Sequence, residues 1–373
     1  DRRVERVHVD AAALGDRARA ITHDPHLQAW RELQPWEHTN LSALNPSTKR
    51  GARWPLGARV RGAWRRRFGR NVPQLPESAG VIVPEVFSPT VARALPGLFA
   101  HVRGPKVALF HDAIALRFPE LTPIKTVARF PAYLVELLAF DGVAAVSEDS
   151  RAALVDYWSW LGAQSCPPVL AIPLGVDAGG AARPASPPSA GPPIVLSVGS
   201  VEGRKNHVAL LEACEQLWAG GVQFQLHLIG LAHSATGAAA LARIRSLQKT
   251  GRPLRYDGPV GEAALEAAYA ACTFTAYPSR VEGFGLPVIE SLTHGKPCIC
   301  SAHGALGESS RGGGCVALES VDTASLSVAI KRLLDSPAVV AALAAAARQR
   351  RFRSWHEYAD HLAAWIGELS SRK

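Results

Sequence analysis

The chain has 373 residues and a net charge of +9, a length that exceeds one ordinary hydrophobic core and predicts two domains. No run of roughly 18 apolar residues occurs and no leader with a small-residue cleavage site is visible, so the sequence predicts a soluble or peripheral protein. The positive charge favours anionic partners without identifying them. The six cysteines form no Cys-x-x-Cys pair. They predict reduced, buried thiols, with Cys298-Ile-Cys300 in a strand that is covered on both faces.

The N-terminal part of the chain combines a weak strand pattern with a strongly basic segment. Residues Val4–Val9 alternate weakly and predict a strand. Segment 49–71 interleaves Trp, Phe, Leu and Val with the basic residues Lys49, Arg50, Arg53, Arg59, Arg61, Arg65, Arg66, Arg67 and Arg70. Basic residues with interfacial aromatics suit an anionic membrane surface. A solvated helix face is the plain alternative. Nucleic-acid binding is the third interpretation, although no recognised nucleic-acid module surrounds the segment.

From residue 80 onward, short apolar runs alternate with helical segments. The predicted strands are 80–84, 107–110, 142–146 and 169–174, and Ser147 is expected to cap a helix that continues through Trp160. This pattern favours a parallel sheet with both faces covered. Ligands of such sheets bind beyond the carboxyl ends of the strands, where His111, Ser147 and Gly175 fall.

Residues 177–193 are rich in Pro, Gly, Ala and Ser and predict a linker between two domains. The alternating pattern then restarts. The predicted strands are 194–198, 224–229, 254–256, 272–277, 298–301 and 315–318, and the predicted helices are 206–219 and 262–271. A long Ala-rich helix is expected to begin at Pro337, and a last helix runs towards Leu369.

The most informative stretch is 277–290, which predicts a strand end, a glycine-rich loop and a helix start. Gly283 and Gly285 allow close backbone approach to a ligand, and Pro287 suits the first turn of a helix. Free N–H groups in this loop would form an anion or hydroxyl site. Glu282 and Glu290 bracket the loop with seven residues between them. Because carboxylates accept hydrogen bonds from paired hydroxyls, the pattern suits a sugar and a ribose.

The wider string Tyr277-Pro-Ser…Glu282-Gly-Phe-Gly-Leu-Pro…Glu290-Ser…Gly295-Lys-Pro297 resembles the E-x7-E motif of family 4 of the retaining glycosyltransferases. The resemblance implies an α/β GT-B fold, with two Rossmann-like domains whose parallel sheets face each other across a cleft and a C-terminal helix that crosses back. The expected units are an acceptor-side domain (1–176), a linker (177–193), a nucleotide-sugar domain (194–350) and the crossing helix (351–373). The family usually opens with a strand and a glycine-rich loop. No such loop is evident, so either it lies upstream of Asp1 or the protein lacks it.

The same resemblance assigns roles around the donor. Segment Val198–Asn206 is similar to the family's diphosphate-binding segment, with Lys205 at the position of its lysine. Many relatives carry Arg just after Gly199, where this chain has Ser200, so Arg204 is the nearest substitute for the second cation. An anionic ligand gives a reason for cations beside a helix N-terminus. The implied donor-binding residues are Gly199, Ser200, Arg204, Lys205, Gly283, Phe284, Gly285, Leu286, Glu290 and Val260. Glu290 is expected to hold the ribose hydroxyls, and Glu282 with the 283–286 backbone the donor sugar.

In the N-terminal domain, His111 of Leu109–Leu116 resembles a family histidine that reaches the donor sugar. The expected catalytic group is therefore Glu282, Lys205 and His111, with Glu282 neither nucleophile nor general base. Asp112 is a weaker candidate that could simply cap the turn. Ser147 and Arg151 are expected to be a helix cap and a helix face, with a role near the cleft as the alternative. No Asp-x-Asp or metal-spaced His/Cys cluster occurs. A metal-independent enzyme without a cofactor is therefore expected.

The resulting hypothesis is a retaining hexosyltransferase of bacterial O-antigen or capsule synthesis. Phe284, the Gly295-Lys-Pro297 ending and the His111-Asp112 segment look most like mannosyltransferases, which suggests GDP-mannose as donor. The acceptor would be lipid-linked or saccharide. Alternatives are a UDP- or dTDP-sugar donor, or a nucleotide-sugar enzyme or binder that is not a transferase. A cytoplasmic location, or a peripheral one on the inner face of the plasma membrane through segment 49–71, is expected, and nucleic acid is the less favoured partner.

Overall fold

The computed structural model describes residues 11–15, 18–24, 29–33, 75, 77–176, 191–233 and 236–371. The expected strand at Val4–Val9, the basic segment 49–71 and most of the linker 177–193 lie outside these residues, so those predictions stay predictions. Within the described part of the chain, no helix is both long enough and apolar enough to cross a bilayer.

The N-terminal lobe is built on a seven-stranded sheet with the order β3-β2-β1-β4-β5-β6-β7. Its strands are β1 (Ala11–Leu14), β2 (Arg19–Asp24), β3 (Ala29–Glu32), β4 (Gly80–Val83), β5 (Lys106–Phe110), β6 (Gly142–Ala145) and β7 (Val169–Ala171). Strands β4 to β7 are parallel, as the alternating pattern predicts. The first three strands run antiparallel to their neighbours. The sheet is therefore mixed, and these edge strands were not predicted.

One face of this sheet is covered by helices that form the main core of the lobe. They are α3 (Pro89–Phe99), α4 (Ile114–Arg117), η1 (Pro119–Leu121), α5 (Ile124–Glu136), η2 (Leu137–Ala139) and α6 (Glu148–Trp160). Tyr133, Leu134 and Trp158 are fully buried between helices and sheet. Ser147 caps α6 by accepting a hydrogen bond from the Ser150 N–H, as predicted.

The C-terminal lobe contains a six-stranded parallel sheet with the order β10-β9-β8-β11-β12-β13. Its strands are β8 (Ile194–Val198), β9 (Gln225–Ile229), β10 (Leu254–Tyr256), β11 (Phe274–Tyr277), β12 (Cys298–Ser301) and β13 (Cys315–Leu318). Its helices are η3 (Gly203–Lys205), α7 (His207–Ala219), α8 (Ala238–Lys249), α9 (Glu262–Ala271), α10 (Leu286–Thr293), α11 (Gly304–Ser310), α12 (Thr323–Asp335) and α13 (Pro337–Gln349). All four residues of β12 are buried, which confirms a strand with both faces covered.

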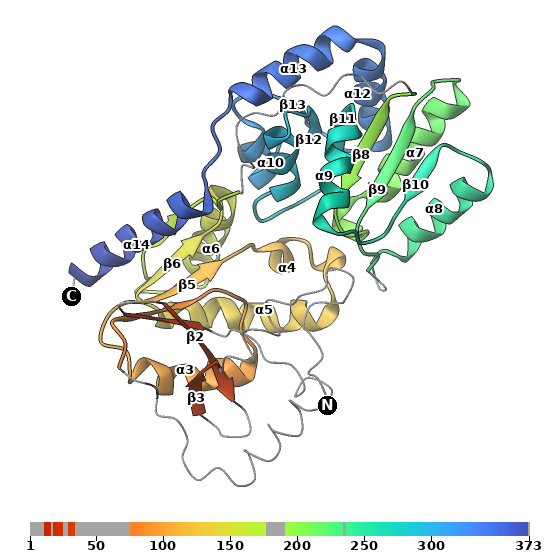
Figure 1. Ribbon diagram of the computed structural model, residues 1–373. Helices are drawn as coiled ribbons and strands as arrows, with labels where there is room; N and C mark the ends of the chain where they lie inside the picture. Colours follow the sequence, from red (N-terminus) through yellow and green to blue (C-terminus); the bar gives the residue numbers. More distant parts are fainter. Residues whose placement is uncertain are drawn as a thin grey trace, which may run out of the picture.

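The last helix, α14 (Trp355–Ser371), leaves the C-terminal lobe and covers the second face of the N-terminal sheet (Figure 1). Trp365 and Leu369 pack on this face together with Val107 and Ala144. The crossing is tight, because a Cβ on Gly175 would lie 2.5 Å from the Trp355 backbone. The expected crossing helix is confirmed, and it ties the two lobes together.

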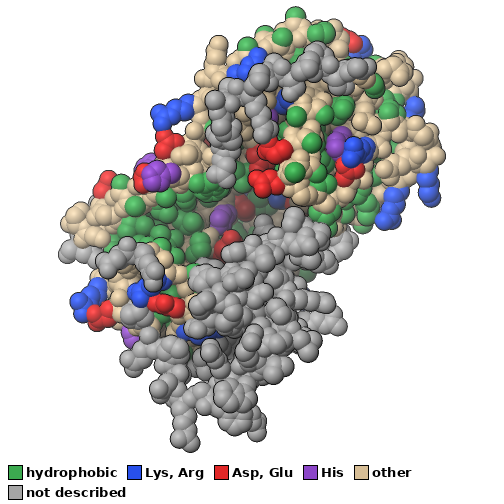
Figure 2. Space-filling view, in the orientation of Figure 1, with side chains coloured by type: hydrophobic (Ala, Val, Ile, Leu, Met, Phe, Trp, Pro, Cys, Tyr) green, Lys and Arg blue, Asp and Glu red, His purple; other side chains and the backbone are tan. Residues whose placement is uncertain are grey.

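The two lobes meet at the carboxyl ends of their strands. Gly283, in the loop after β11, packs against the backbone of His111, which follows β5. The space-filling view shows a hollow between the lobes in which His and Asp/Glu side chains gather (Figure 2). Two facing α/β domains with a cleft between them are the arrangement that the sequence predicts.

Candidate active site

The C-terminal lobe presents a turn between β11 and α10 as the centre of the site. Gly285 adopts φ +99°, a conformation that a residue with a side chain rarely accepts. Helix α10 starts directly after it, with Pro287 in the first turn. The predicted strand, loop and helix are all present, and Glu282 lies at the start of the turn.

Arg204 and Lys205 reach this turn from η3, which follows β8, and both contact Glu282. Lys205 Nζ lies 2.6 Å from Glu282 Oε1, and both side chains are buried. Arg204 donates to the other carboxylate oxygen, Oε2, and its second terminal nitrogen lies 2.9 Å from Glu202. Two charge-assisted contacts to one carboxylate fix the positions of both cations.

Tyr277 completes this cluster and was missed by the sequence analysis. Its hydroxyl donates to Glu282 Oε1 at 2.8 Å and accepts a hydrogen bond from Lys205 Nζ. The ammonium group also lies 4.8 Å from the centre of the tyrosine ring, within the range of a cation–π interaction. The sequence signal was its place at a strand end, five residues before Glu282, in the string that carries the family resemblance, but no role was assigned to it.

Electrostatics keep Glu282 ionised in spite of its burial. Burial alone would raise the pKa of Glu282, but the charges of Lys205 and Arg204 outweigh that effect and hold the pKa below its usual value. Burial lowers the pKa of Lys205, with Glu282 opposing the shift and Arg204 adding to it. Glu202 also pairs with Arg204, so two carboxylates face the two cations of this cluster.

The backbone of the turn is oriented by hydrogen bonds to its carbonyl groups. Ser147 Oγ donates to the Gly283 carbonyl at 2.7 Å, and Ser309 Oγ donates to the Phe284 carbonyl at 2.6 Å. The N–H groups of residues 283–285 donate to no other residue of the part of the chain that the structure describes. This arrangement matches the expected cradle of free N–H groups.

Glu290 lies on α10, with its carboxylate turned towards α9. It accepts a hydrogen bond from the Tyr269 hydroxyl at 3.2 Å. Burial raises the pKa of Glu290, while Tyr269 and the more distant charge of Lys205 oppose the shift. The Tyr269 ring stacks on His294 at 4.5 Å between ring centres. This packing restricts the position of the carboxylate that is expected to bind ribose.

In the N-terminal lobe, His111 and Asp112 follow β5 and face the turn. His111 Nε2 lies 2.7 Å from the Pro84 carbonyl, which anchors the ring. Asp112 accepts the N–H of Ile114 at 2.9 Å, so it does cap its own turn. Burial raises the pKa of Asp112, although the charges of Arg204 and His111 act in the opposite direction. The charge of Arg204, in the other lobe, thus acts on Asp112.

The remaining candidates divide between the site and its surroundings. Ser200 Oγ donates to Glu202 at 2.7 Å, next to Gly199, whose φ is +149°. Val260 packs against the β8 side of the C-terminal sheet. Arg151 pairs with Glu148 on its own helix, as expected for a helix face.

Among the described residues, no cluster of His, Cys, Asp or Glu is arranged to hold a metal ion.

Comparisons with known proteins identify a family and several relatives that are similar to this chain. Residues 181–350 match the family model described as glycosyl transferases group 1. The serotype-specific mannosyltransferase WbdA of Escherichia coli is 25% identical over 253 residues, which cover 62% of this chain and 30% of that protein. D-inositol 3-phosphate glycosyltransferase 1 of Catenulispora acidiphila is 30% identical over 179 residues, 46% of this chain and 43% of that protein. The chain thus spans less than half the length of these curated relatives.

Solved structures show the same architecture. Sucrose-phosphate synthase from Thermosynechococcus elongatus superimposes with a TM-score of 0.63 at 21% identity, over 84% of this chain and 77% of that one. Anabaena Alr3699/HepE, in complex with UDP and glucose, gives a TM-score of 0.62 at 17% identity, over 77% of each chain. These likenesses show that the fold is GT-B.

Proposed function

Because the chain belongs to the glycosyl transferases group 1 family, we propose that it transfers a hexose from a nucleotide sugar to a saccharide or lipid-linked acceptor, with retention of the anomeric configuration. One observation carries the proposal: Lys205 and Arg204 converge on Glu282 beside a turn with free N–H groups. Cations and N–H groups of this kind stabilise the negative charge that develops on a departing diphosphate.

Each lobe has a separate task in the proposed reaction. The C-terminal lobe holds the donor, with Lys205 and Arg204 at the diphosphate, Glu290 at the ribose hydroxyls and Glu282 with the 283–286 backbone at the sugar. The N-terminal lobe brings His111 to the sugar. The leaving phosphate oxygen accepts the proton of the acceptor hydroxyl, so the reaction needs no pair of carboxylates of the glycoside-hydrolase kind. Lys205 and Arg204 act in place of a divalent ion.

Mannose from GDP-mannose is the proposed donor, in the synthesis of a bacterial surface polysaccharide. Support comes from the relatives named WbdA and O-antigen chain mannosyltransferase B, both from Escherichia coli. A UDP-sugar is the alternative, because the similar HepE structure holds UDP and glucose. Membrane association through segment 49–71 is a separate proposal. Replacing Arg65, Arg66 and Arg67 by Glu would weaken sedimentation with anionic liposomes if it holds.

A thermal-shift panel of GDP-mannose, UDP-glucose and dTDP-glucose identifies the donor, because a ligand that binds only the folded state raises Tm. Release of the nucleotide must then depend on the acceptor. Glu290→Ala is expected to abolish the shift while unfolding normally without ligand, and an unchanged donor affinity in this variant contradicts the ribose assignment. Strong, salt-sensitive oligonucleotide binding without turnover would contradict the transferase proposal.

A further inference from the structure

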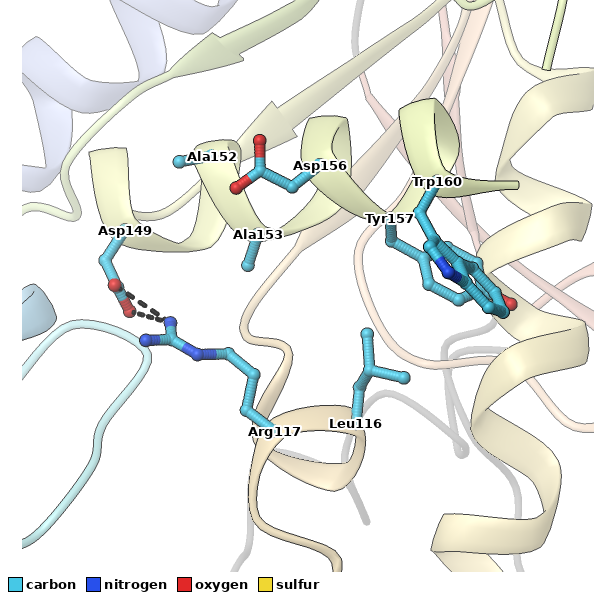
Figure 3. A pocket seen from close by; sticks show the side chains of 8 residues that line it. All are labelled: Leu116, Arg117, Asp149, Ala152, Ala153, Asp156, Tyr157 and Trp160. Atoms are coloured by element: carbon cyan, nitrogen blue, oxygen red, sulfur yellow. Dashed lines mark hydrogen bonds and ion pairs between the residues drawn. The ribbon is translucent and has the colours of Figure 1, made fainter. Parts of the chain in front are cut away.

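The N-terminal lobe contains a pocket of about 500 Å³ that the proposed chemistry does not use. It lies between α4 and α6 (Figure 3). Its lining consists of Leu116, Arg117, Asp149, Ala152, Ala153, Asp156, Tyr157 and Trp160. The size and the mixture of apolar, aromatic and a few charged side chains are typical of small-molecule sites.

The pocket is lined by one stripe of helix α6. Residues 149, 152, 153, 156, 157 and 160 line it, and those on neighbouring turns are three or four positions apart, the spacing of one helix face. Such a face normally packs against the protein. Here Ala152 and Ala153 have short side chains, which leave the middle of the stripe open.

The aromatic end of the pocket offers a platform for a flat apolar surface. The rings of Tyr157 and Trp160 lie 5.8 Å apart at 34°, next to each other at one end of the lining (Figure 3). Trp160 is 80% exposed. Together the two rings offer an aromatic face beside the hollow on which a ligand can stack.

The polar end selects against anions. Arg117 donates to both oxygens of Asp149 at 2.9 Å, so these two charges compensate each other. Asp156 adds a further carboxylate to the lining. The pocket therefore carries a net negative charge, which disfavours phosphates, nucleotides and anionic lipid surfaces. Carboxylates accept hydrogen bonds from hydroxyl groups. A neutral ligand with many hydroxyls and an apolar face fits both ends.

Helix α6 contributes residues both to the pocket and to the contact with the candidate active site. At the start of this helix, Ser147 and Ser150 donate to the Gly283 carbonyl, and Glu308 of α11 accepts the N–H groups of Glu148 and Asp149. Asp149 thus stands at the junction of the lobes, and Trp160 lies on the last turn of the same helix. Thirteen helical residues span about 20 Å.

We infer that this pocket is a saccharide subsite. It binds a neutral part of the acceptor chain. The far end of the pocket lies about 20 Å along α6 from the end of the helix that contacts the candidate active site. Tyr157 and Trp160 stack on the apolar faces of the sugar rings, and Asp156 accepts from their hydroxyls. This inference rests on the proposed function, because it assumes that the acceptor is an oligosaccharide.

Calorimetric titration of the full chain with α-mannohexaose, and in parallel with maltohexaose, tests the subsite without donor or turnover. We expect one of them to bind, and Trp160→Ala to weaken binding about tenfold, the loss of one aromatic stacking contact. Trp160→Phe should restore part of the affinity, and Asp156→Asn should weaken it less than Trp160→Ala. Val328→Ala removes another exposed apolar side chain, 69% exposed, from the other lobe and serves as control.

The outcomes separate this inference from the proposed transferase activity. Saccharide binding that depends on Trp160, without any hexose transfer, supports the subsite and contradicts the transferase. Transfer whose KM for a hexasaccharide acceptor is the same in wild type and Trp160→Ala overturns the subsite alone. Failure of both oligosaccharides to bind also overturns it. So does a Trp160→Ala variant that keeps its saccharide affinity and loses binding to anionic vesicles, because that result makes the surface a membrane contact.

Discussion

The two lobes carry the candidate site in different ways. In the C-terminal lobe, the site residues come from two short segments, 199–206 and 277–290, and contact each other directly. In the N-terminal lobe, they are single side chains at strand ends, such as His111 and Ser147, which meet the other lobe mainly through backbone atoms. In the C-terminal lobe the candidate site is therefore encoded in contiguous motifs, whereas in the N-terminal lobe it depends on tertiary placement.

The largest expected effect tests the contiguous half of this comparison. Lys205→Ala removes the buried ammonium group that contacts Glu282 and Tyr277. We expect transfer to fall by about 10²- to 10³-fold, the usual loss when one preorganised charge-stabilising group is removed. The measurement is the rate of hexose transfer at saturating acceptor. Lys331→Ala, which removes an exposed lysine on α12, is the control. Near-normal transfer by Lys205→Ala would contradict the assignment of the diphosphate site.

The next effect tests the dispersed half. His111→Ala removes a ring that is anchored on the Pro84 carbonyl at the end of β5. Because the proposed reaction assigns the nucleotide to the other lobe and His111 to the sugar, we expect kcat to fall by about 10²-fold. The affinity for the free nucleotide should change less than about threefold, because the proposal assigns no nucleotide contact to His111. Titration with nucleotide alone, beside steady-state kinetics, measures both. Equal losses in nucleotide affinity and kcat would contradict the proposal that one lobe binds the nucleotide and the other contributes His111 to the reaction.

A third variant acts on the contact between the lobes. A Cβ on Gly283 would lie 2.2 Å from the His111 carbonyl oxygen, so Gly283→Ala must push the turn and β5 apart. Since a displacement of about 1 Å can cost up to 10²-fold in rate, we expect transfer to fall at least about tenfold. Gly97→Ala, at a position with open space around it, is the control. Full activity of Gly283→Ala would show that this contact is not part of the working conformation.

The same contrast explains how much was predictable. The strands from β4 to β13 and the turn at 277–290 follow from local pattern, because short apolar runs and glycine positions are local signals. Strand β1, with the sequence Ala-Ala-Ala-Leu, and helix α11, with two glycines and two serines, carry weak propensities. Tertiary contacts stabilise them, such as that of Glu308 with the start of α6.

The functional contacts that were missed have a related cause. Ser147 meets Gly283 across 136 residues, and Tyr277 joins Lys205 across 72. A local sequence pattern does not predict contacts between residues that are so far apart along the chain. The stripe on α6 is visible in the sequence, but only the structure shows that nothing in the described part of the chain fills the pocket along it.

The prediction with the smallest expected effect at neutral pH concerns the free energy of unfolding, and it rests on a residue of the C-terminal lobe. His207 follows the Arg204-Lys205-Asn206 segment and is 3% exposed, and its Nδ1 has no hydrogen-bond partner among the described residues. Burial, with a smaller contribution from Lys205, lowers the pKa of His207 to about 4. Between pH 6.5 and 4 the unfolded chain binds a proton at this residue that the folded chain does not. Stability therefore falls as the pH falls through this window, by about 3 kcal/mol in total.

His207→Leu removes this titration. We expect the Tm of the variant to decline less than that of wild type between pH 6.5 and 4, whatever its Tm at neutral pH. Thermal unfolding followed by circular dichroism over this range is the measurement, with His101→Leu, at an exposed position of the N-terminal lobe, as the matched control.

The C-terminal lobe should also be the first to unfold in acid, because it holds a neutral imidazole in its core, two residues after a buried lysine. Parallel acid sensitivity in wild type and His207→Leu would mean that other groups set the acid limit. Glu282 would then be the first to examine, because its lowered pKa makes its ion pairs lose stability in the same direction as the pH falls.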